Sequence, residues 1–380
     1  MKDEYPDSKS DLFAAFIVRC AGLARPDGTA AMITMQSWMF LSSYEKLRAS
    51  LLTRQRITSM LHLGARAFDS IGGEVVSSTA FVLANMPSEA RGFARRRAGT
   101  FIRLVDGTSE AEKVAALSTA VEIRAKDAGF HLASDADFTT IPGSPIVYWL
   151  SEKMRAAFDG FASLGEYSQP REGLTTTDNA RFKRAWWEVS LLDMAFGLQT
   201  RTAPHGKRWF PMNDGGAYRK WYGNQETVID WANDGEALKT FIVEKIGSHW
   251  SKQIRSDKWY LLPSVAVGKI TSSEPSFRIY GDGFIPDSAA KFLCIETEFE
   301  RFALAGYLNS STATELLSAM APTLNVTGKA LSGLPFASTE KVVPGVRSLL
   351  ETSESDWNSY ETSLEFSENP LVALGKHEGA

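Results

Sequence analysis

The side chains that most often carry catalysis occur in this chain without the neighbours that catalysis needs. No histidine has a cysteine or a second histidine at the spacing of a metal-ligand pair, so we expect structural or surface roles for all of them. No G-x-S-x-G pattern presents a nucleophilic serine. Gly281-Asp282-Gly283 is a lone turn signal. The sequence predicts no metal site and no self-contained catalytic site. The histidines are His62, His131, His205, His249 and His377.

Composition limits the classes of protein to which the chain can belong. Its 380 residues are enough for two domains, and a hydrophobic content of 44% is ordinary for a globular protein. The net charge of −4 means that any surface for nucleic acid must be local. Only Cys20 and Cys294 are present, the first ten residues are polar, and no apolar run reaches the length of a membrane span. We therefore expect a soluble cytoplasmic protein with no membrane partner.

The first 90 residues alternate helical and strand patterns. Short apolar or β-rich runs predict strands over 29–35, 57–63 and 75–84, the last returning antiparallel after a short loop. Ser42 with Glu45 three residues later is typical of a capping box that begins a helix through about Arg54. This order predicts one side of an α/β sheet. An earlier helix is indicated by apolar positions on one stripe: Leu12, Phe13, Phe16, Ile17, Cys20 and Leu23.

The rest of the chain is less periodic. Residues 88–128 are basic and then polar; we interpret them as a solvated loop, with a phosphate contact as the alternative. A helix is expected over 147–161, and a domain boundary near 160–172. The mixture of aromatic, Gly and Thr residues over 171–335 predicts an α+β domain, with helices over 298–308 and 311–320. The acidic tail is predicted to be helical over 342–366 and disordered at its end.

Several strings of this sequence are long and specific enough to identify a family. They are Tyr5–Phe13 (YPDSKSDLF), Met32–Arg48 (MITMQSWMFLSSYEKLR), His62–Phe68 (HLGARAF), Gly72–Val76 (GGEVV), Gly173–Phe182 (GLTTTDNARF), Gly247–Ser251 (GSHWS), Gly283–Ile285 (GFI) and Pro322–Asn325 (PTLN). Together they resemble the PglX adenine-specific DNA methyltransferases of BREX phage-defence systems, which are akin to Type IIG restriction-modification enzymes. The resemblance covers residues 1–336.

The resemblance implies a fold, an activity and a cofactor. Residues 1–165 would be the C-terminal half of a class I, Rossmann-like methyltransferase domain that uses S-adenosyl-L-methionine. Residues 166–336 would be an α+β DNA target-recognition domain, and residues 337–380 an acidic tail that is partly helical or disordered. The implied reaction is site-specific N6-adenine methylation of duplex DNA in a phage-defence or restriction-modification system, with the target base flipped out of the stack.

The sequence departs from the family pattern in one respect. It contains neither the N-P-P-Y tetrapeptide, which holds the target amino group, nor the glycine-rich cofactor loop. We therefore expect an N-terminally truncated member that is inactive alone, whether through a split gene, a frameshift or a fragmentary gene call. Its expected partner is duplex DNA, and a split gene would add a separately encoded N-terminal half and other phage-defence proteins. The alternative is a non-catalytic DNA-binding or assembly subunit that requires such a half.

Some family positions match residues of this chain. Leu12, Phe13 and Phe16 match the helix that packs against the cofactor's adenine, although plain helix core explains the same residues. Phe68 matches the loop aromatic that stacks on the flipped adenine. Its polar, Gly-flanked loop is harder to explain as core, so we favour the functional interpretation.

The second implied domain supplies candidate DNA-binding residues. They carry short polar or bidentate groups of the kind that contact phosphates and base edges. Between Arg171 and Arg278, sixteen Lys and Arg residues stand against twelve Asp and Glu residues, a mild excess that suits phosphate contacts. The candidates are Thr175, Thr176, Thr177, Asn179 and Arg181.

Overall fold

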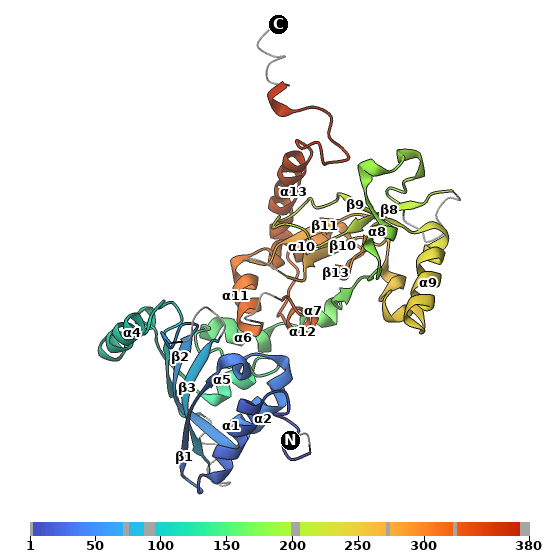
Figure 1. Cartoon of the computed structure of the whole chain (residues 1–380). Coiled ribbons are helices and arrows are strands. Elements are labelled where there is room, and N and C mark those ends of the chain that lie inside the picture. Colours follow the sequence, from blue (N-terminus) through green and yellow to red (C-terminus); the bar gives the residue numbers. More distant parts are fainter. Residues whose placement is uncertain are drawn as a thin grey trace. The chain divides into compact units, whose positions relative to one another are not determined.

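The computed structural model describes residues 3–70, 76–86, 96–198, 206–270, 274–321 and 325–372. These residues form a mixed α/β fold, which confirms the predicted fold class at that level (Figure 1). The chain divides into two compact units, Met1–Gly160 and Phe161–Ala380, here called unit 1 and unit 2.

Unit 1 is built on one five-stranded sheet in the order β1-β3-β2-β4-β5. β3 lies between β1 and β2 and is antiparallel to both, so β1 and β2 run in the same direction. β4 is parallel to β2, and β5 is antiparallel to β4. The carboxyl ends of β1, β2 and β4 therefore meet at one edge of the sheet, here called the carboxyl edge. The strands are β1 Thr29–Met35, β2 Gln55–Gly64, β3 Ser78–Asn85, β4 Gly99–Arg103 and β5 Phe130–Ala133.

Helix α1 runs antiparallel to β1. The ring of Phe13, in its first turn, lies 5.6 Å from that of Tyr44, which belongs to the segment following β1. At the opposite end, the side chain of Asn85 donates to the carbonyls of Ala21 and Ala24 (3.1 and 2.8 Å). The first turn of α1 therefore lies on the side of the carboxyl edge. The helices of unit 1 are α1 Leu12–Leu23, α2 Glu45–Arg54, α4 Glu110–Ile123, α5 Asp135–Thr139 and α6 Glu152–Gly160, with 3-10 turns at Gln36–Met39, Ser42–Tyr44 and Lys126–Ala128.

A buried arginine holds the segment after β1 in place. Arg48, on α2, is only 2% exposed, and its guanidinium donates to the carbonyls of Trp38, Leu41 and Gly143 at 2.8–3.0 Å. Burial lowers the pKa of this group to about 10, which leaves it charged at neutral pH. Four N–H···O bonds to carbonyls therefore surround the charge with oriented peptide dipoles.

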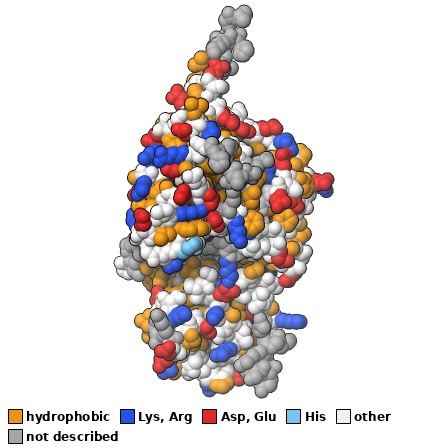
Figure 2. Space-filling model, turned by 90° about the vertical axis from the view of Figure 1, so that its right-hand side faces the viewer, with side chains coloured by type: hydrophobic (Ala, Val, Ile, Leu, Met, Phe, Trp, Pro, Cys, Tyr) orange, Lys and Arg blue, Asp and Glu red, His pale blue; other side chains and the backbone are white. Residues whose placement is uncertain are grey.

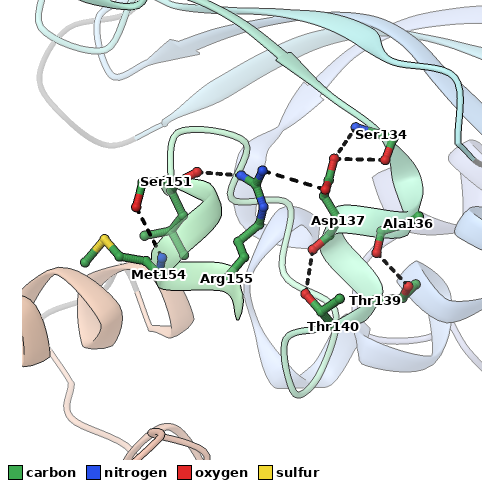
Figure 3. Close-up of polar contacts among 9 residues, drawn as sticks. Ser134, Ala136, Asp137, Thr139, Thr140, Ser151, Met154 and Arg155 are labelled. Carbon is green, nitrogen blue, oxygen red and sulfur yellow. Dashed lines mark hydrogen bonds and ion pairs between the residues drawn. The ribbon is translucent and has the colours of Figure 1, made fainter. Parts of the chain in front are cut away.

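Arg155 fastens the last helix of unit 1 to its neighbours (Figure 3). Its guanidinium donates to the carbonyl of Leu150 (2.5 Å) and lies 3.6 Å from the carboxylate of Asp137. Asp137 in turn accepts from the backbone N–H and hydroxyl of Ser134 (2.7 and 2.8 Å), closing the capping box that begins α5. α6 is therefore attached to α5.

Unit 2 contains two four-stranded sheets in the orders β11-β10-β13-β6 and β12-β8-β9-β7. Its core includes Phe210, Trp231, Tyr260 and Phe292, which pack beneath α9. The strands are β6 Arg171–Glu172, β7 Lys183–Ala185, β8 Trp209–Asn213, β9 Thr227–Asp230, β10 Ser264–Gly268, β11 Phe277–Tyr280, β12 Ile285–Pro286 and β13 Ala290–Cys294. The α-helices are α7 Leu164–Tyr167, α8 Asn179–Phe182, α9 Ala232–Ile246, α10 Glu298–Leu308, α11 Ser311–Met320, α12 Gly328–Ser332 and α13 Val343–Trp357. The 3-10 turns are Trp186–Glu188, Leu191–Asp193, Trp250–Lys252, Asp257–Trp259 and Glu340–Val342.

Several predicted elements are confirmed. The strand over 29–35 and the helices over 298–308 and 311–320 have the predicted bounds, and the antiparallel return of the third strand is observed. That strand begins at Ser78, and Val75 lies outside the described residues. Among the described residues, none of the helices is both long enough and apolar enough to span a bilayer.

Other predicted elements are wrong. The capping box at Ser42 does not form: a 3-10 turn occupies Ser42–Tyr44, and α2 begins at Glu45 with no side-chain cap. The loop interpretation of 88–128 misses β4 and α4, because α4 has its own N-cap, Ser109, which accepts from the N–H of Glu112 (3.3 Å).

Two predicted helices are shorter than expected. The helix expected over 147–161 begins only at Glu152, because Val147, Tyr148 and Leu150 are buried in a turn. The tail helix expected over 342–366 is α13, which ends at Trp357.

Candidate functional site

Three polar side chains meet at the carboxyl edge of unit 1. Gln36 directly follows β1, His62 lies near the end of β2 and Arg103 ends β4. Nε2 of His62 lies 2.7 Å from Oε1 of Gln36, and Nδ1 lies 3.0 Å from the hydroxyl of Tyr148. In open α/β sheets, ligands bind at the carboxyl ends of parallel strands. The edge is therefore the expected place for a site in this unit.

His62 is a neutral organiser of this edge. An amide oxygen only accepts, so Nε2 carries the proton and Nδ1 accepts from Tyr148. Burial, with Arg103 and Lys113 nearby, lowers the pKa of His62 to about 3. The ring is therefore uncharged at neutral pH. Among the described residues, no group of three or more His, Cys, Asp or Glu side chains is placed to hold a metal ion.

An aromatic ring and a cation lie beside His62. The ring of Trp149 stacks on the imidazole with centroids 5.9 Å apart and an interplanar angle of 30°. The guanidinium carbon of Arg103 lies 4.9 Å from the centroid of the same indole. Both side chains are half-buried. The edge thus presents an indole and a guanidinium, which are groups suited to bases and phosphates.

Phe68 lies in the loop that follows β2. Its side chain is 37% exposed, so core packing does not account for it. The next residue, Asp69, exchanges two hydrogen bonds with Glu110 at the start of α4: Asp69 N–H to Glu110 Oε1 (2.7 Å) and Glu110 N–H to Asp69 Oδ1 (3.1 Å). These two hydrogen bonds hold the loop against the start of α4 at the residue next to Phe68.

The candidate cofactor residues of α1 divide into exposed and packed side chains. Leu12 and Phe16 are 58% and 51% exposed, whereas the buried face of the helix is made of Ala14, Ala15, Ile17 and Ala21. Leu12 and Phe16 therefore lie outside the buried face of α1 in this structure. Phe13 is half-buried against Tyr44. An exposed apolar pair thus lies at the turn of α1 nearest the carboxyl edge.

In unit 2, the candidate DNA-binding residues lie on one segment, Gly173–Arg181, which leads into the short helix α8 and is here called the Thr loop. Its start threads between two other segments: Leu174 N–H donates to the carbonyl of Pro286 (3.0 Å), and Thr175 N–H donates to that of Gln253 (2.9 Å). A Cβ on Gly173 would lie 1.9 Å from the Pro286 oxygen, so the close approach requires glycine. The backbone of the loop is fixed where it enters.

The three threonines of the loop differ in their surroundings. Thr176 is 1% exposed, and its hydroxyl bonds to the side-chain oxygen of Asn179, so it can act on a ligand only through Asn179. Thr177 has a left-handed backbone (φ 62°), which is strained for a β-branched residue. Its buried hydroxyl has no hydrogen-bond partner among the described residues. Thr175 is half-buried.

Arg181 is the exposed cation of the Thr loop. Its guanidinium carbon lies 4.6 Å from the ring centroid of Phe241 and 5.1 Å from that of Phe182. Lys245 adds a second positive charge, donating from Nζ to the carbonyl of Thr177 (3.3 Å). On the face drawn in Figure 2, the described basic and acidic side chains are interspersed, so a nucleic-acid surface there would be small and local.

Sequence reasoning missed the residues that support these sites. Gln36 carried a signal, because it directly follows a predicted strand and a site at the carboxyl edge uses such positions. Asp69 and Glu110 are 41 residues apart, and no local pattern connects them. His205 and His377 lie outside the described residues.

Comparisons with known proteins agree on a methyltransferase family. A family model described as the Eco57I restriction-modification methylase matches residues 1–68. The chain is 38% identical over 372 residues to the adenine-specific methyltransferase PglX of Lacticaseibacillus casei (strain Zhang), covering 97% of this chain and 30% of that protein. It is 34% identical over 382 residues to the adenine-specific methyltransferase BrxX of Escherichia coli O9:H4 (strain HS), covering 100% of this chain and 29% of that protein.

These matches confirm the resemblance to PglX that the sequence predicted. The chain spans about 30% of the length of the curated relatives it matches. A solved structure of the Type IIL restriction-modification enzyme MmeI in complex with DNA is similar with a TM-score of 0.48 and 10% identity, over 98% of this chain and 49% of that one.

Proposed function

We propose that this chain acts in the N6-methylation of adenine in duplex DNA, within a cytoplasmic phage-defence system. The observation that carries the proposal is the 38% identity to PglX over 97% of the chain, since a relative of that similarity is named for this chemistry. The proposed partners are duplex DNA and the other parts of such a system.

In this proposal unit 1 is the later half of a class I methyltransferase domain. The antiparallel placement of β3 between β1 and β2 agrees with that assignment, and the carboxyl edge is where such sheets bind ligands. S-adenosyl-L-methionine would supply the methyl group. The exposed apolar side chains of Leu12 and Phe16 fit a role against its adenine.

Phe68 would hold the flipped base. A half-exposed ring on a loop beside the carboxyl edge can stack on an extruded adenine without first leaving a core. Base–aromatic stacking contributes about 1–3 kcal/mol. Because the base is extruded only after DNA has bound, Phe68 is expected to affect methyl transfer more than duplex affinity.

Unit 2 would bind and read the DNA. The Thr loop offers the amide of Asn179 and the guanidinium of Arg181, and both residues are exposed. Arg181 can contact a phosphate or form a bidentate pair with a guanine edge. Lys245, which bonds the Thr177 carbonyl, adds positive charge to the same surface.

Duplex binding by the full chain tests the DNA-binding part of the proposal. We expect an affinity that falls steeply as salt rises from about 50 to 200 mM, because phosphate contacts release counterions. A matched single-stranded oligonucleotide separates duplex recognition from general attraction of polyanions. No duplex binding at low salt would contradict the assignment of unit 2.

Methyl transfer is tested in a chimera, in which this chain replaces the matching segment of the L. casei PglX. We expect incorporation of labelled methyl groups at adenine N6, with strong loss of the rate in Phe68→Ala and little change in duplex affinity. A chimera that is folded and binds duplex DNA but transfers no methyl group would contradict the proposed function.

A further inference from the structure

We propose that Asp69 and Glu110 are positioning residues that fix the Phe68 loop against helix α4. This inference rests on the proposed role of Phe68 in methyl transfer. Helix α4 would then determine the position of the stacking ring. In the sequence, this helix was interpreted as part of a loop.

The contact between the two residues is reciprocal. Glu110 Oε1 accepts from the N–H of Asp69 (2.7 Å), and Asp69 Oδ1 accepts from the N–H of Glu110 (3.1 Å). Glu110 is the first residue of α4, so its N–H has no acceptor within the helix. Asp69 therefore supplies an acceptor for the first N–H of α4 from 41 residues away, beside the N-cap Ser109, while Glu110 holds the residue next to Phe68.

Helix α4 is itself firmly attached to the sheet. Lys113, 4% exposed, donates from Nζ to the carbonyls of Leu63 (2.7 Å) and Leu104 (2.9 Å), which lie at the ends of β2 and β4. Ala120 on the same helix is buried against Ile102. The partner that holds the Phe68 loop is thus anchored by a buried ammonium and by apolar packing.

This arrangement has a direct consequence for stacking. The ring of Phe68 is 37% exposed, so contacts with the core do not by themselves fix its place. A stacking group displaced by about 1 Å loses much of its effect on a reaction rate. Opening the Asp69–Glu110 contact should therefore slow methyl transfer while leaving the DNA contacts of the Thr loop unchanged.

The first test measures the contact in the full chain. Hydrogen exchange of the amides over residues 65–70 is expected to become about tenfold faster in Glu110→Ala. Glu110→Gln keeps an acceptor oxygen and should remain close to the original protein. Equal exchange in all these proteins would overturn the proposed contact.

A matched control removes a neighbouring carboxylate from the same turn of α4. Glu112 accepts from the N–H and hydroxyl of Thr108 (2.7 and 2.9 Å), and within the described part of the chain no hydrogen bond joins it to the Phe68 loop. Glu112→Ala removes a similar charge from the helix N-terminus. It should therefore leave exchange over 65–70 nearly unchanged, and an acceleration equal to that of Glu110→Ala would assign the effect to α4 as a whole and overturn the inference.

The second test measures methyl transfer by the chimera with the L. casei PglX. Glu110→Ala is expected to lower kcat about tenfold with little change in KM for DNA, and Glu110→Gln should restore kcat. Because Glu110 acts through Phe68, adding Glu110→Ala to Phe68→Ala should cause no further loss.

The outcomes separate this inference from the function on which it rests. A further loss in the double variant, or a full rate in Glu110→Ala with Phe68→Ala impaired, would overturn the positioning role alone. A full rate in Phe68→Ala would contradict the proposed function of Phe68, whatever hydrogen exchange shows for the contact.

Discussion

The carboxyl edge of unit 1 and the Thr loop of unit 2 treat their polar groups in opposite ways. At the edge, both ring nitrogens of His62 are bonded, and the cations of Arg48 and Lys113 donate to backbone carbonyls. In the Thr loop, the buried hydroxyl of Thr177 lacks a partner among the described residues, and Arg181 faces solvent. The polar groups of the edge are bonded within unit 1, whereas the Thr loop presents the guanidinium of Arg181 to solvent.

Backbone strain follows the same division. Thr177 holds a left-handed conformation that costs a β-branched residue about 1–2 kcal/mol. Such strain persists only where the surroundings impose it, and here the bonds of Leu174 and Thr175 to neighbouring segments fix the entry to the loop. We therefore expect substitutions at the edge to act on stability first, and substitutions of the exposed residues of the Thr loop to act on binding first.

The largest expected effect comes from removing the guanidinium of Arg48. Arg48→Met leaves the buried carbonyls of Trp38, Leu41 and Gly143 without their donor, which should lower the free energy of unfolding of unit 1 by about 3–5 kcal/mol. Urea unfolding followed by hydrogen exchange of β2 measures it. Arg347→Ala, at an exposed residue, serves as the control. An equal loss of stability in this variant would show that the buried bonds of Arg48 contribute no more than an exposed arginine does.

Acid should destabilise unit 1 through His62. Its pKa is about 3 in the fold and about 6.5 when unfolded, so the unfolded chain binds more protons between these values. Stability is therefore full above about pH 6.5 and declines as the pH falls toward 3, by about 2 kcal/mol between pH 7 and 5. Urea unfolding at several pH values checks this.

A matched pair of variants tests whether His62 causes this pH dependence of stability. In His62→Gln the free energy of unfolding should vary less with pH, whereas His249→Gln, at an exposed residue of unit 2, should leave the pH dependence unchanged. If the pH dependence is the same in His62→Gln as in the original protein, other titrating groups cause it. Buried His131, whose pKa is also lowered by burial, is the first of these.

Arg181→Ala should weaken duplex binding about tenfold at low salt and leave thermal stability nearly unchanged. The loss will be confined to particular sequences if Arg181 reads a guanine edge, and uniform if it holds a phosphate. Arg347→Ala is the matched control, because that exposed arginine is paired with Glu298. Gel-shift titrations with several duplexes measure the affinities of the two variants. An equal loss of affinity in the control would show that the Thr loop is not part of the DNA-binding surface.

The smallest expected effect is a gain in stability at Thr177. Thr177→Gly relieves the left-handed strain at the cost of a more flexible unfolded chain, for a net stabilisation of about 0.5–1 kcal/mol. Thermal unfolding of the full chain measures it. A loss of stability instead would show that the buried hydroxyl makes a contact that the fold needs.

The sequence predicted those elements whose signals are local. The strand over 29–35 is a single apolar run, and the helices over 298–308 and 311–320 begin at their own caps, Thr297 and Ser310. Prediction failed where tertiary contacts decide the structure. Buried Arg48 holds the segment before α2, so the local capping signal at Ser42 does not set the helix start.

The site was predictable to a smaller extent. The resemblance pointed to Phe68 and to the Thr loop, but their supports come from distant parts of the chain. Glu110 bonds to Asp69, 41 residues away in the sequence. Position 173 must be glycine because a Cβ there would collide with the carbonyl oxygen of Pro286. Spacing along one sequence does not show such contacts, because they exist only after the sheet and its helices have packed.

The most direct test of this account measures duplex affinity and methyl transfer together in the chimera with the L. casei PglX. We predict that Phe68→Ala loses methyl transfer at unchanged affinity, and that Arg181→Ala loses affinity but recovers its rate at saturating DNA. The opposite pattern, or the same pattern in both variants, would contradict the assignment of base stacking to unit 1 and DNA binding to unit 2.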